Sequence, residues 1–180
     1  MIKRKLSMDE LGRKTVDEFK NAAKLPIIVI LDNVRSLHNI GSIFRTSDAF
    51  LVESIYICGI STPPPHPEIH KSALGAENSV HWQYFNETKS ALSLVKEKGY
   101  VAVSAEQTDQ SIKLHEFDIN ANGKYALIFG NEVRGVDQEI INECDFSVEI
   151  PQFGTKHSFN VSVSAGVILW EWYKNLQKKR

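Results

Sequence analysis

The chain has 180 residues, of which 42% are apolar and 24% are charged, and its formal net charge is −1. This length and composition predict one globular domain with a full hydrophobic core. Two cysteines, Cys58 and Cys144, are too few for a disulfide scaffold, and their apolar surroundings predict inert buried thiols. No apolar run reaches the ~20 residues that a membrane helix needs. No signal peptide is recognisable, so we expect a cytoplasmic protein.

The charges are unevenly distributed along the chain. Residues 1 to 24 hold seven basic residues against four acidic ones. A second basic cluster consists of Lys174, Lys178, Lys179 and Arg180. A protein that binds nucleic acid mainly through phosphates carries a basic face. Each cluster is equally compatible with an ordinary solvated chain end, so charge alone does not decide between the two interpretations.

The predicted elements begin with a helical segment in residues 1 to 24, where Ser7-x-x-Glu10 has the pattern of a capping box that starts an amphipathic helix. A single domain is expected over residues 25 to 180. Short apolar strands are predicted at about residues 27–31, 55–58, 100–104, 124–129 and 146–150. Helices are predicted at about residues 39–50, 88–98, 137–143 and 160–177. This alternation predicts an α/β fold, with a mainly parallel sheet flanked by helices on both faces.

Two histidines in the middle of the chain raise the question of a metal site. His66 and His70 are four residues apart with Glu68 between them, which on a helix would place two potential ligands on one face. The prolines from Pro63 to Pro67 predict a surface loop instead of a regular helix. No third ligand or cysteine pair is evident, so we expect no metal.

Polar and glycine-containing segments follow three of the predicted strands. No G-x-G-x-x-G follows the first strand and no Walker sequence is present, which removes the common nucleotide-binding fingerprints. The carboxyl ends of parallel strands meet at one edge of a sheet, where ligands bind. The candidate segments are Asn33…Asn39-x-Gly41-x-x-x-Arg45, then Phe129-Gly130-Asn131-Glu132-x-x-Gly135, and then Ile150-Pro151…Ser158-Phe159-Asn160-Val161.

In this order and spacing, the three segments resemble the motifs of the SpoU/TrmH branch of the SPOUT RNA methyltransferases. The resemblance covers roughly residues 25 to 175, and Phe159 departs from it, because the family more often has leucine there. It implies a SPOUT-type knotted fold with a C-terminal trefoil knot, S-adenosylmethionine as the cofactor and RNA as a partner. It also implies a homodimer with sites formed by both protomers, and the helices that begin at Asn39 and Asn160 are the expected interface.

The resemblance assigns methyl transfer to a ribose 2′-hydroxyl, with Arg45 acting on that hydroxyl. Because a guanidinium normally stays charged, the physically safer role for Arg45 is to stabilise the developing alkoxide and to bind phosphate. The other catalytic candidates are Asn33, Glu132, Ser158 and Asn160, and Glu132 and Asn160 are expected to hold Arg45 or the ribose. The cofactor-binding candidates are Ala105, Glu106, Phe129, Gly130, Asn131, Gly135, Ile150, Pro151, Ser158, Phe159 and Val161. The RNA-binding candidates are Asn39, Arg45, Lys3, Arg4 and Lys5.

The RNA target is a finer question. The chain resembles the TrmH-type enzymes that act on guanosine 18 of tRNA, including the tract SAEQTDQSIKL at residues 104 to 114 and the ending WEWYKN. tRNA is therefore the expected partner, and rRNA is the alternative. A noncatalytic RNA- or cofactor-binding module of the same fold is a third hypothesis. The five catalytic candidates together argue against it, because a binding module does not need all of them.

Overall fold

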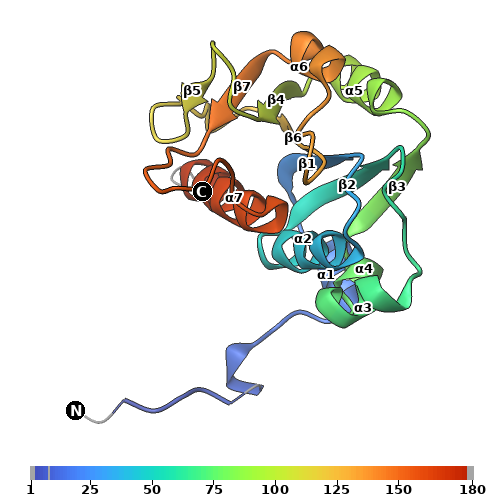
Figure 1. The fold of residues 1–180 in the computed structure, drawn as a ribbon. Helices are drawn as coiled ribbons and strands as arrows, with labels where there is room; N and C mark the ends of the chain where they lie inside the picture. Colours follow the sequence, from blue (N-terminus) through green and yellow to red (C-terminus); the bar gives the residue numbers. More distant parts are fainter. Residues whose placement is uncertain (1–2, 8, 178–180) are drawn as a thin grey trace.

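The computed structural model describes residues 3–7 and 9–177, which form a parallel seven-stranded sheet in the order β3-β2-β1-β6-β4-β7-β5 (Figure 1). Its strands are β1 (Leu25–Asp32), β2 (Val52–Cys58), β3 (His81–Phe85), β4 (Val101–Ala105), β5 (Ile112–Lys113), β6 (Tyr125–Phe129) and β7 (Phe146–Glu149). The helices are η1 (Asp9–Leu11), α1 (Val16–Asn21), α2 (Leu37–Ala49), α3 (Pro67–Ala73), α4 (Ala76–Ser79), α5 (Thr88–Glu97), α6 (Gln138–Glu143) and α7 (Val161–Gln177). The expected α/β class is confirmed. The basic residues 178 to 180 lie outside the described part of the chain.

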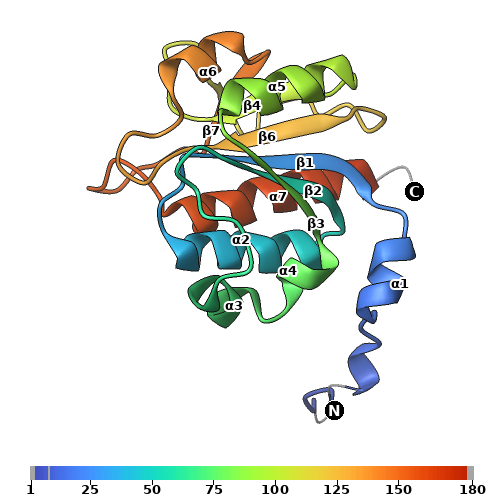
Figure 2. The ribbon, with the colours of Figure 1, turned by 90° about the vertical axis from the view of Figure 1, so that its right-hand side faces the viewer.

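The central strand β1 is buried on both faces of the sheet. Ile27, Val29 and Leu31 belong to the core cluster that includes the buried apolar residues of α2 and α7. Ile28 and Ile30 belong to the cluster on the opposite face, with residues of α5 and α6. Figure 2 shows these two helical layers, with α2, α3, α4 and α7 on one side of the sheet and α5 and α6 on the other. A continuous apolar strand is the pattern expected when helices cover both faces of a parallel sheet.

The N-terminal segment contains two short helices instead of the one amphipathic helix that was predicted. Ser7 and Glu10 form the expected capping box, with Glu10 Oε2 accepting from the Ser7 N–H at 2.8 Å, but it starts only the single turn η1. A second capping box, between Thr15 and Glu18, starts α1. The segment before α1 extends away from the sheet (Figure 1). Without a core to pack on, a short helix is only marginally stable.

The proline-rich run does not prevent a helix, so the expectation that no regular helix follows it was wrong. Helix α3 begins at Pro67, and the His66 Nδ1 atom accepts a hydrogen bond from the Glu68 N–H at 3.2 Å. Proline is compatible with the first position of a helix because its missing N–H would have no partner within the helix there. The short elements β3, β5 and α4 were also not predicted. The edge strand β3 is largely exposed and lacks an apolar run.

The two cysteines are separate free thiols, as expected. Cys58 is buried and Cys144 is partly buried. Burial raises the pKa of each thiol to about 12. Both therefore stay protonated near neutral pH, which agrees with the prediction of inert thiols.

Within the described residues, no helix is both long enough and apolar enough to cross a membrane. The path of the chain through a trefoil knot stays a prediction from the resemblance.

Candidate active site

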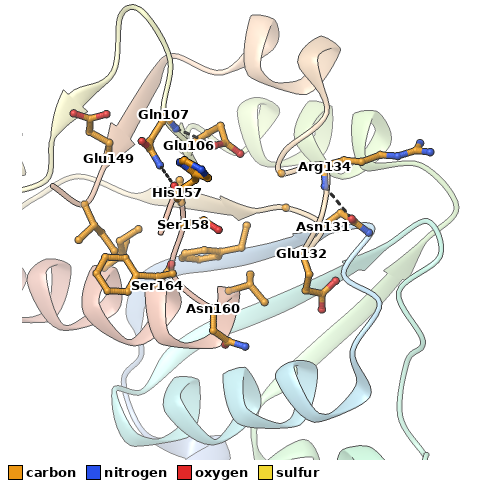
Figure 3. Close-up of a pocket in the computed structure, with 18 of the residues that line it drawn as sticks. Glu106, Gln107, Asn131, Glu132, Arg134, Glu149, His157, Ser158, Asn160 and Ser164 are labelled. Carbon is orange, nitrogen blue, oxygen red and sulfur yellow. Dashed lines mark hydrogen bonds between the residues drawn. The ribbon is translucent and has the colours of Figure 1, made fainter. Parts of the chain in front are cut away.

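A cavity of about 560 Å³ lies where the carboxyl ends of β4, β6 and β7 meet the start of α7. Its wall combines backbone turns, apolar side chains and polar side chains from three distant parts of the sequence. The lining residues are Ala105, Glu106, Gln107, Phe129, Gly130, Asn131, Glu132, Val133, Arg134, Gly135, Val148, Glu149, Ile150, Gln152, His157, Ser158, Phe159, Asn160, Val161, Ser164 and Ile168. The structure thus brings the second and third candidate segments together around one hollow (Figure 3).

The turn after β6 is closed by its own hydrogen bonds. The backbones of Asn131 and Gly135 donate to each other at 2.9 and 2.8 Å, and the Asn131 Oδ1 atom accepts from the Val133 N–H at 2.9 Å. Gly130 is required by close packing, because a Cβ there would lie 2.1 Å from the Val136 N atom. Gly135 has a φ of +72°, which disfavours a side chain. This wall of the cavity is therefore a tight turn that its own hydrogen bonds hold closed.

Glu132 connects this turn to the start of α2. Its two carboxylate oxygens accept hydrogen bonds from the Arg35 and Ser36 N–H groups, at 3.0 and 2.9 Å. Its Oε1 atom also accepts from the Asn39 side chain, with a distance of 3.0 Å between Asn39 Nδ2 and Glu132 Oε1. Partial burial acts to raise the pKa of Glu132, but these hydrogen bonds outweigh it and hold the pKa below its ordinary value. The carboxylate form of Glu132 is therefore the one that the fold stabilises.

Asn160 completes the network from the third segment. Its Nδ2 atom donates to the Asn39 Oδ1 atom at 3.1 Å. Its own Oδ1 atom accepts from the Ser162 N–H at 2.9 Å, which caps the first turn of α7. In Figure 3, Glu132 and Asn160 both point toward α2. Asn39, which is 6% exposed, is thus the residue at which all three candidate segments meet. From the sequence we expected Asn39 only to bind RNA, although its place at the start of a helix beside two other polar segments could have indicated its position in this network.

Arg45 lies apart from this network. It is exposed in the second half of α2 and is not among the residues that line the cavity in the described part of the chain. Glu132 and Asn160 hold Asn39, whereas they were expected to hold Arg45 or the ribose. Ser158, by contrast, lies in the cavity wall as expected of a site residue. The catalytic role of Arg45 stays a prediction.

Asn33 has its side chain directed away from the cavity. Its Oδ1 atom accepts from the Ile60 N–H at 3.2 Å and its Nδ2 atom donates to Asp32 at 2.9 Å. Its φ of +55° is unusual for a residue other than glycine, and asparagine is among those that tolerate it best. Its carbonyl accepts from the Asn131 side chain at 2.8 Å. Asn33 therefore supports the turn after β6 from behind.

All but one of the cofactor-binding candidates line the cavity, the exception being Pro151. Several lining residues were not among the candidates. Gln107 is one of these, and its Nε2 atom donates to the His157 carbonyl at 2.9 Å (Figure 3). This hydrogen bond joins the segment after β4 to the loop before α7. The position of Gln107 at a strand end, next to Glu106, was a signal that could have identified it.

The remaining RNA-binding candidates lie far from the cavity. Lys3, Arg4 and Lys5 are exposed on the N-terminal segment that extends away from the sheet (Figure 1). Arg4 forms an ion pair with Glu10, with 2.6 Å between the Arg4 Nη2 and Glu10 Oε1 atoms. The structure therefore does not bring these basic residues together with the other candidates.

The two histidines considered as metal ligands have other partners. His66 caps α3, and His70 contacts Glu77 at 2.5 Å. Among the described residues, no group of three or more His, Cys, Asp and Glu side chains is placed to hold a metal ion.

Comparison with known proteins gives a consistent family. The model of the SpoU rRNA Methylase family matches residues 26–170. The chain is 32% identical over 155 residues to the 23S rRNA (guanosine-2'-O-)-methyltransferase RlmB of Neisseria meningitidis, covering 86% of this chain and 61% of that protein. It is 28% identical over 172 residues to the tRNA (guanosine(18)-2'-O)-methyltransferase of Aquifex aeolicus, covering 92% of this chain and 77% of that protein. The chain thus spans less than two thirds of the length of the Neisseria protein.

Solved structures agree with this result. The TrmH/SpoU tRNA modifying enzyme of A. aeolicus superposes with a TM-score of 0.79 at 28% identity, covering 89% of this chain and 80% of that one. The AdoMet-bound rRNA methyltransferase from Sinorhizobium meliloti superposes with a TM-score of 0.77 at 26% identity, covering 89% of this chain and 60% of that one. The chain belongs to the SpoU rRNA methylase family.

Proposed function

We propose that this protein transfers a methyl group from S-adenosylmethionine to a ribose 2′-hydroxyl of RNA. The observation that carries the proposal is the hydrogen-bonded network of Glu132, Asn39 and Asn160, which joins all three candidate segments at the edge of the cavity. The second and third segments alone would be enough to form a wall that binds a ligand. The link to α2 fixes the helix that carries Arg45 relative to the cavity.

The cavity suits S-adenosylmethionine in size and charge. A volume of about 560 Å³ is typical of sites for small ligands. Glu106, Glu132 and Glu149 are among its lining residues, and their negative charges complement the positive sulfonium and ammonium groups of the cofactor. Gly130 and Gly135 line the cavity, and without side chains they leave room for a ligand to approach the backbone. The S. meliloti relative is an AdoMet-bound enzyme, which supports the same cofactor here.

The chemistry that remains for the protein is positioning and electrostatics. The cofactor supplies a methyl group that its positive sulfur has already activated. The chain has to hold the ribose hydroxyl in line with that group and to stabilise the charge that develops as the proton leaves. Arg45 provides that charge and binds phosphate. Glu132 and Asn160 act through Asn39, and Ser158 offers a hydroxyl to the bound molecules in the cavity.

The proposed target is tRNA, at a guanosine of the position-18 type. The A. aeolicus relative, which acts on guanosine 18 of tRNA, aligns over 92% of this chain. rRNA is the second candidate, because the Neisseria relative is a 23S rRNA enzyme and is 32% identical. The basic N-terminal segment, with Lys3, Arg4 and Lys5 exposed, is the proposed additional RNA contact.

A homodimer forms part of the proposal. Val163, Val167 and Trp170 are 50, 40 and 49% exposed, and they follow one another along one stripe of α7. Phe159, at the start of the same helix, is 44% exposed. An apolar stripe of this kind beside the cavity is typical of a protein–protein interface. A second copy of the chain is the proposed partner.

Methyl transfer from labelled S-adenosylmethionine to unmodified total tRNA and rRNA, followed by nuclease mapping, tests the proposal. The expected result is label in a ribose-methylated guanosine of tRNA. If only rRNA is labelled, the proposed reaction stands, but the target is rRNA and not tRNA. If no RNA is labelled although calorimetry shows cofactor binding, the proposed methyltransferase activity would be overturned. A noncatalytic binding module would then be favoured.

Arg45→Ala is the matching variant. It is expected to abolish methyl transfer while cofactor affinity stays nearly unchanged, because Arg45 does not line the cavity. Equal loss of cofactor binding would show that Arg45 is structural.

A further inference from the structure

Asp32, the last residue of β1, is a buried carboxylate that the proposed reaction does not use. It is 1% exposed and accepts three hydrogen bonds. Its Oδ1 atom accepts from the Thr88 hydroxyl at 2.6 Å and from the Asn33 side chain at 2.9 Å. Its Oδ2 atom accepts from the Asp137 N–H at 2.8 Å. These donors compensate for the unfavourable burial of a charge.

Two of the three donors lead to the turn that forms one wall of the cavity. Asp137 is the last residue of this turn, which comprises residues 131–137, so Asp32 holds its far end. Asn33 holds the near end, because its carbonyl accepts from the Asn131 side chain at 2.8 Å and its own side chain is bound to Asp32. A further hydrogen bond, from the Val136 N–H to Glu106 Oε2 at 3.0 Å, holds the turn from the side of β4.

We propose that Asp32 is a positioning residue that fixes the turn at residues 131–137 in the shape that binds the cofactor. The inference rests on the proposed function, since the cavity is taken to bind S-adenosylmethionine. Asp32 is not among the residues that line the cavity in the described part of the chain, and it acts through Asn33 and through the Asp137 backbone. A purely structural role would be limited to the third donor, Thr88, which joins β1 to the first turn of α5.

Asp32→Asn separates these roles because an amide has only one oxygen. If that oxygen takes the place of Oδ1, the new NH₂ group faces the Asp137 N–H and the far end of the turn is released. If it takes the place of Oδ2, the NH₂ group faces the Asn33 NH₂ group. Asn33 cannot simply rotate to accept, because its Oδ1 atom already accepts from the Ile60 N–H. Either orientation removes one tether of the turn.

Thr88→Val is the matched control. It removes a hydrogen bond to the same carboxylate, at a residue that is 5% exposed, and leaves both tethers of the turn in place. Both variants are compared with the wild-type protein by calorimetry with S-adenosylmethionine and by hydrogen exchange of the amides at residues 133–137. In the described structure these five amides have the named acceptors Asn131 Oδ1 (for two of them), the Asn131 carbonyl, Glu106 Oε2 and Asp32 Oδ2.

For Asp32→Asn we expect a rise in the dissociation constant of about tenfold, as for the loss of one hydrogen bond to a charged group, and faster exchange confined to residues 133–137. Thr88→Val is expected to lower the melting temperature, while its dissociation constant for S-adenosylmethionine and its exchange rates at residues 133–137 stay close to those of the wild type. Unchanged affinity and exchange in Asp32→Asn, or equal changes in the two variants, would overturn the proposal.

Two further outcomes keep the test decisive. If Asp32→Asn does not fold, Asn33→Gly takes its place, because it removes the hydrogen bond that Asp32 accepts from the Asn33 side chain and suits the φ of +55° at that position; unchanged exchange at residues 133–137 in that variant would overturn the proposal. If the wild-type protein does not bind S-adenosylmethionine, the proposed function fails. The exchange measurement then still decides whether Asp32 holds the turn.

Discussion

At the scale of single residues, the site depends on side chains with two functions. Asn160 caps α7 through its carbonyl oxygen and holds Asn39 through its amide nitrogen. Glu132 likewise accepts from the start of α2 and from Asn39 with the same carboxylate. A simple alanine substitution would disturb both functions together. Variants that change only one atom can separate stability from turnover.

Asn160→Asp is one such variant. The carboxylate keeps an acceptor for the Ser162 N–H, so the cap of α7 and the melting temperature should be preserved. It also places an acceptor against the Asn39 Oδ1 atom, so the network breaks and turnover should fall. Asn160→Ala is expected to lower turnover as well, and to cost about 1 kcal/mol of stability through the lost cap. Methyl-transfer rates and thermal unfolding measure the two effects. Unchanged turnover in both variants would remove Asn160 from the site.

Glu132→Gln tests the electrostatic part of the network. The pKa of Glu132 lies below its ordinary value in the folded protein. The ionised side chain therefore stabilises the folded protein at pH values above the ordinary pKa, and this stabilisation is lost as the pH falls through the folded pKa. Glutamine lacks the charge and presents an NH₂ group to the donors of α2. The variant should therefore melt below the wild type at pH 7, and the gap should narrow once the pH falls below the ordinary value of 4.5. Melting curves from pH 7 to pH 3 measure the gap, and a constant gap would contradict the prediction.

At the scale of elements, glycine has different roles in α2 and α7, the two helices beside the site. A Cβ on Gly41 in α2 would lie 2.1 Å from the Ser72 Oγ atom and 2.4 Å from the Ile69 carbonyl oxygen. Gly41 therefore allows α3 to pack closely against α2, and the glycine of the first segment serves helix packing. Gly166 in α7 has no such neighbour, since nothing lies within 4 Å of a Cβ built there.

Alanine at these two positions should consequently have opposite effects. Gly41→Ala forces two helices apart and should lower the free energy of unfolding by roughly 1–3 kcal/mol. Gly166→Ala should raise it by up to about 1 kcal/mol, because alanine favours the helix and no contact within the described chain is crowded. Chemical denaturation of the two variants measures both values. Equal signs would contradict the assigned packing role of Gly41.

These elements also show what a sequence can and cannot predict. β1 and β6 were predictable because their long apolar runs require burial on both faces of a sheet. β3 and β5 were not, because an exposed edge strand and a two-residue strand exist only through pairing with β2 and β7. In the site, the three segments were predictable from their order after strands. Their partners were not, since the choice of Asn39 over Arg45 depends on how α2 and α7 are placed in space.

At the scale of the whole molecule, two exposed features lie outside the core, and a partner is proposed for each. One is the apolar stripe of α7, for which a second copy of the chain is proposed. Val167→Lys, in the middle of that stripe, should produce a monomer in light scattering without lowering the monomer's helix content, because Val167 is 40% exposed. Lys71→Ala, at an exposed ion pair on α3, is the control and should stay dimeric. A dimeric Val167→Lys variant would refute this interface.

The other feature is the N-terminal segment, whose basic residues extend away from the sheet (Figure 1). If Lys3, Arg4 and Lys5 contact phosphates, each contact releases counterions and steepens the salt dependence of RNA binding. Arg4 is already paired with Glu10, so Lys3 and Lys5 should contribute more than Arg4. Deletion of residues 1–6 should then reduce the slope of log K against log salt by roughly 1–3. Filter binding across a salt series measures that slope.

A matched control removes the same number of cations elsewhere. Lys71, Lys89 and Lys96 are each paired with a carboxylate, at 2.6, 2.8 and 3.7 Å, on the helices α3 and α5. Changing all three to alanine alters the net charge by the same amount as removing Lys3, Arg4 and Lys5, so a general effect of charge would appear in both proteins. A slope that falls only after the deletion assigns the RNA contact to the N-terminal segment. An unchanged slope would remove the N-terminal segment from RNA recognition.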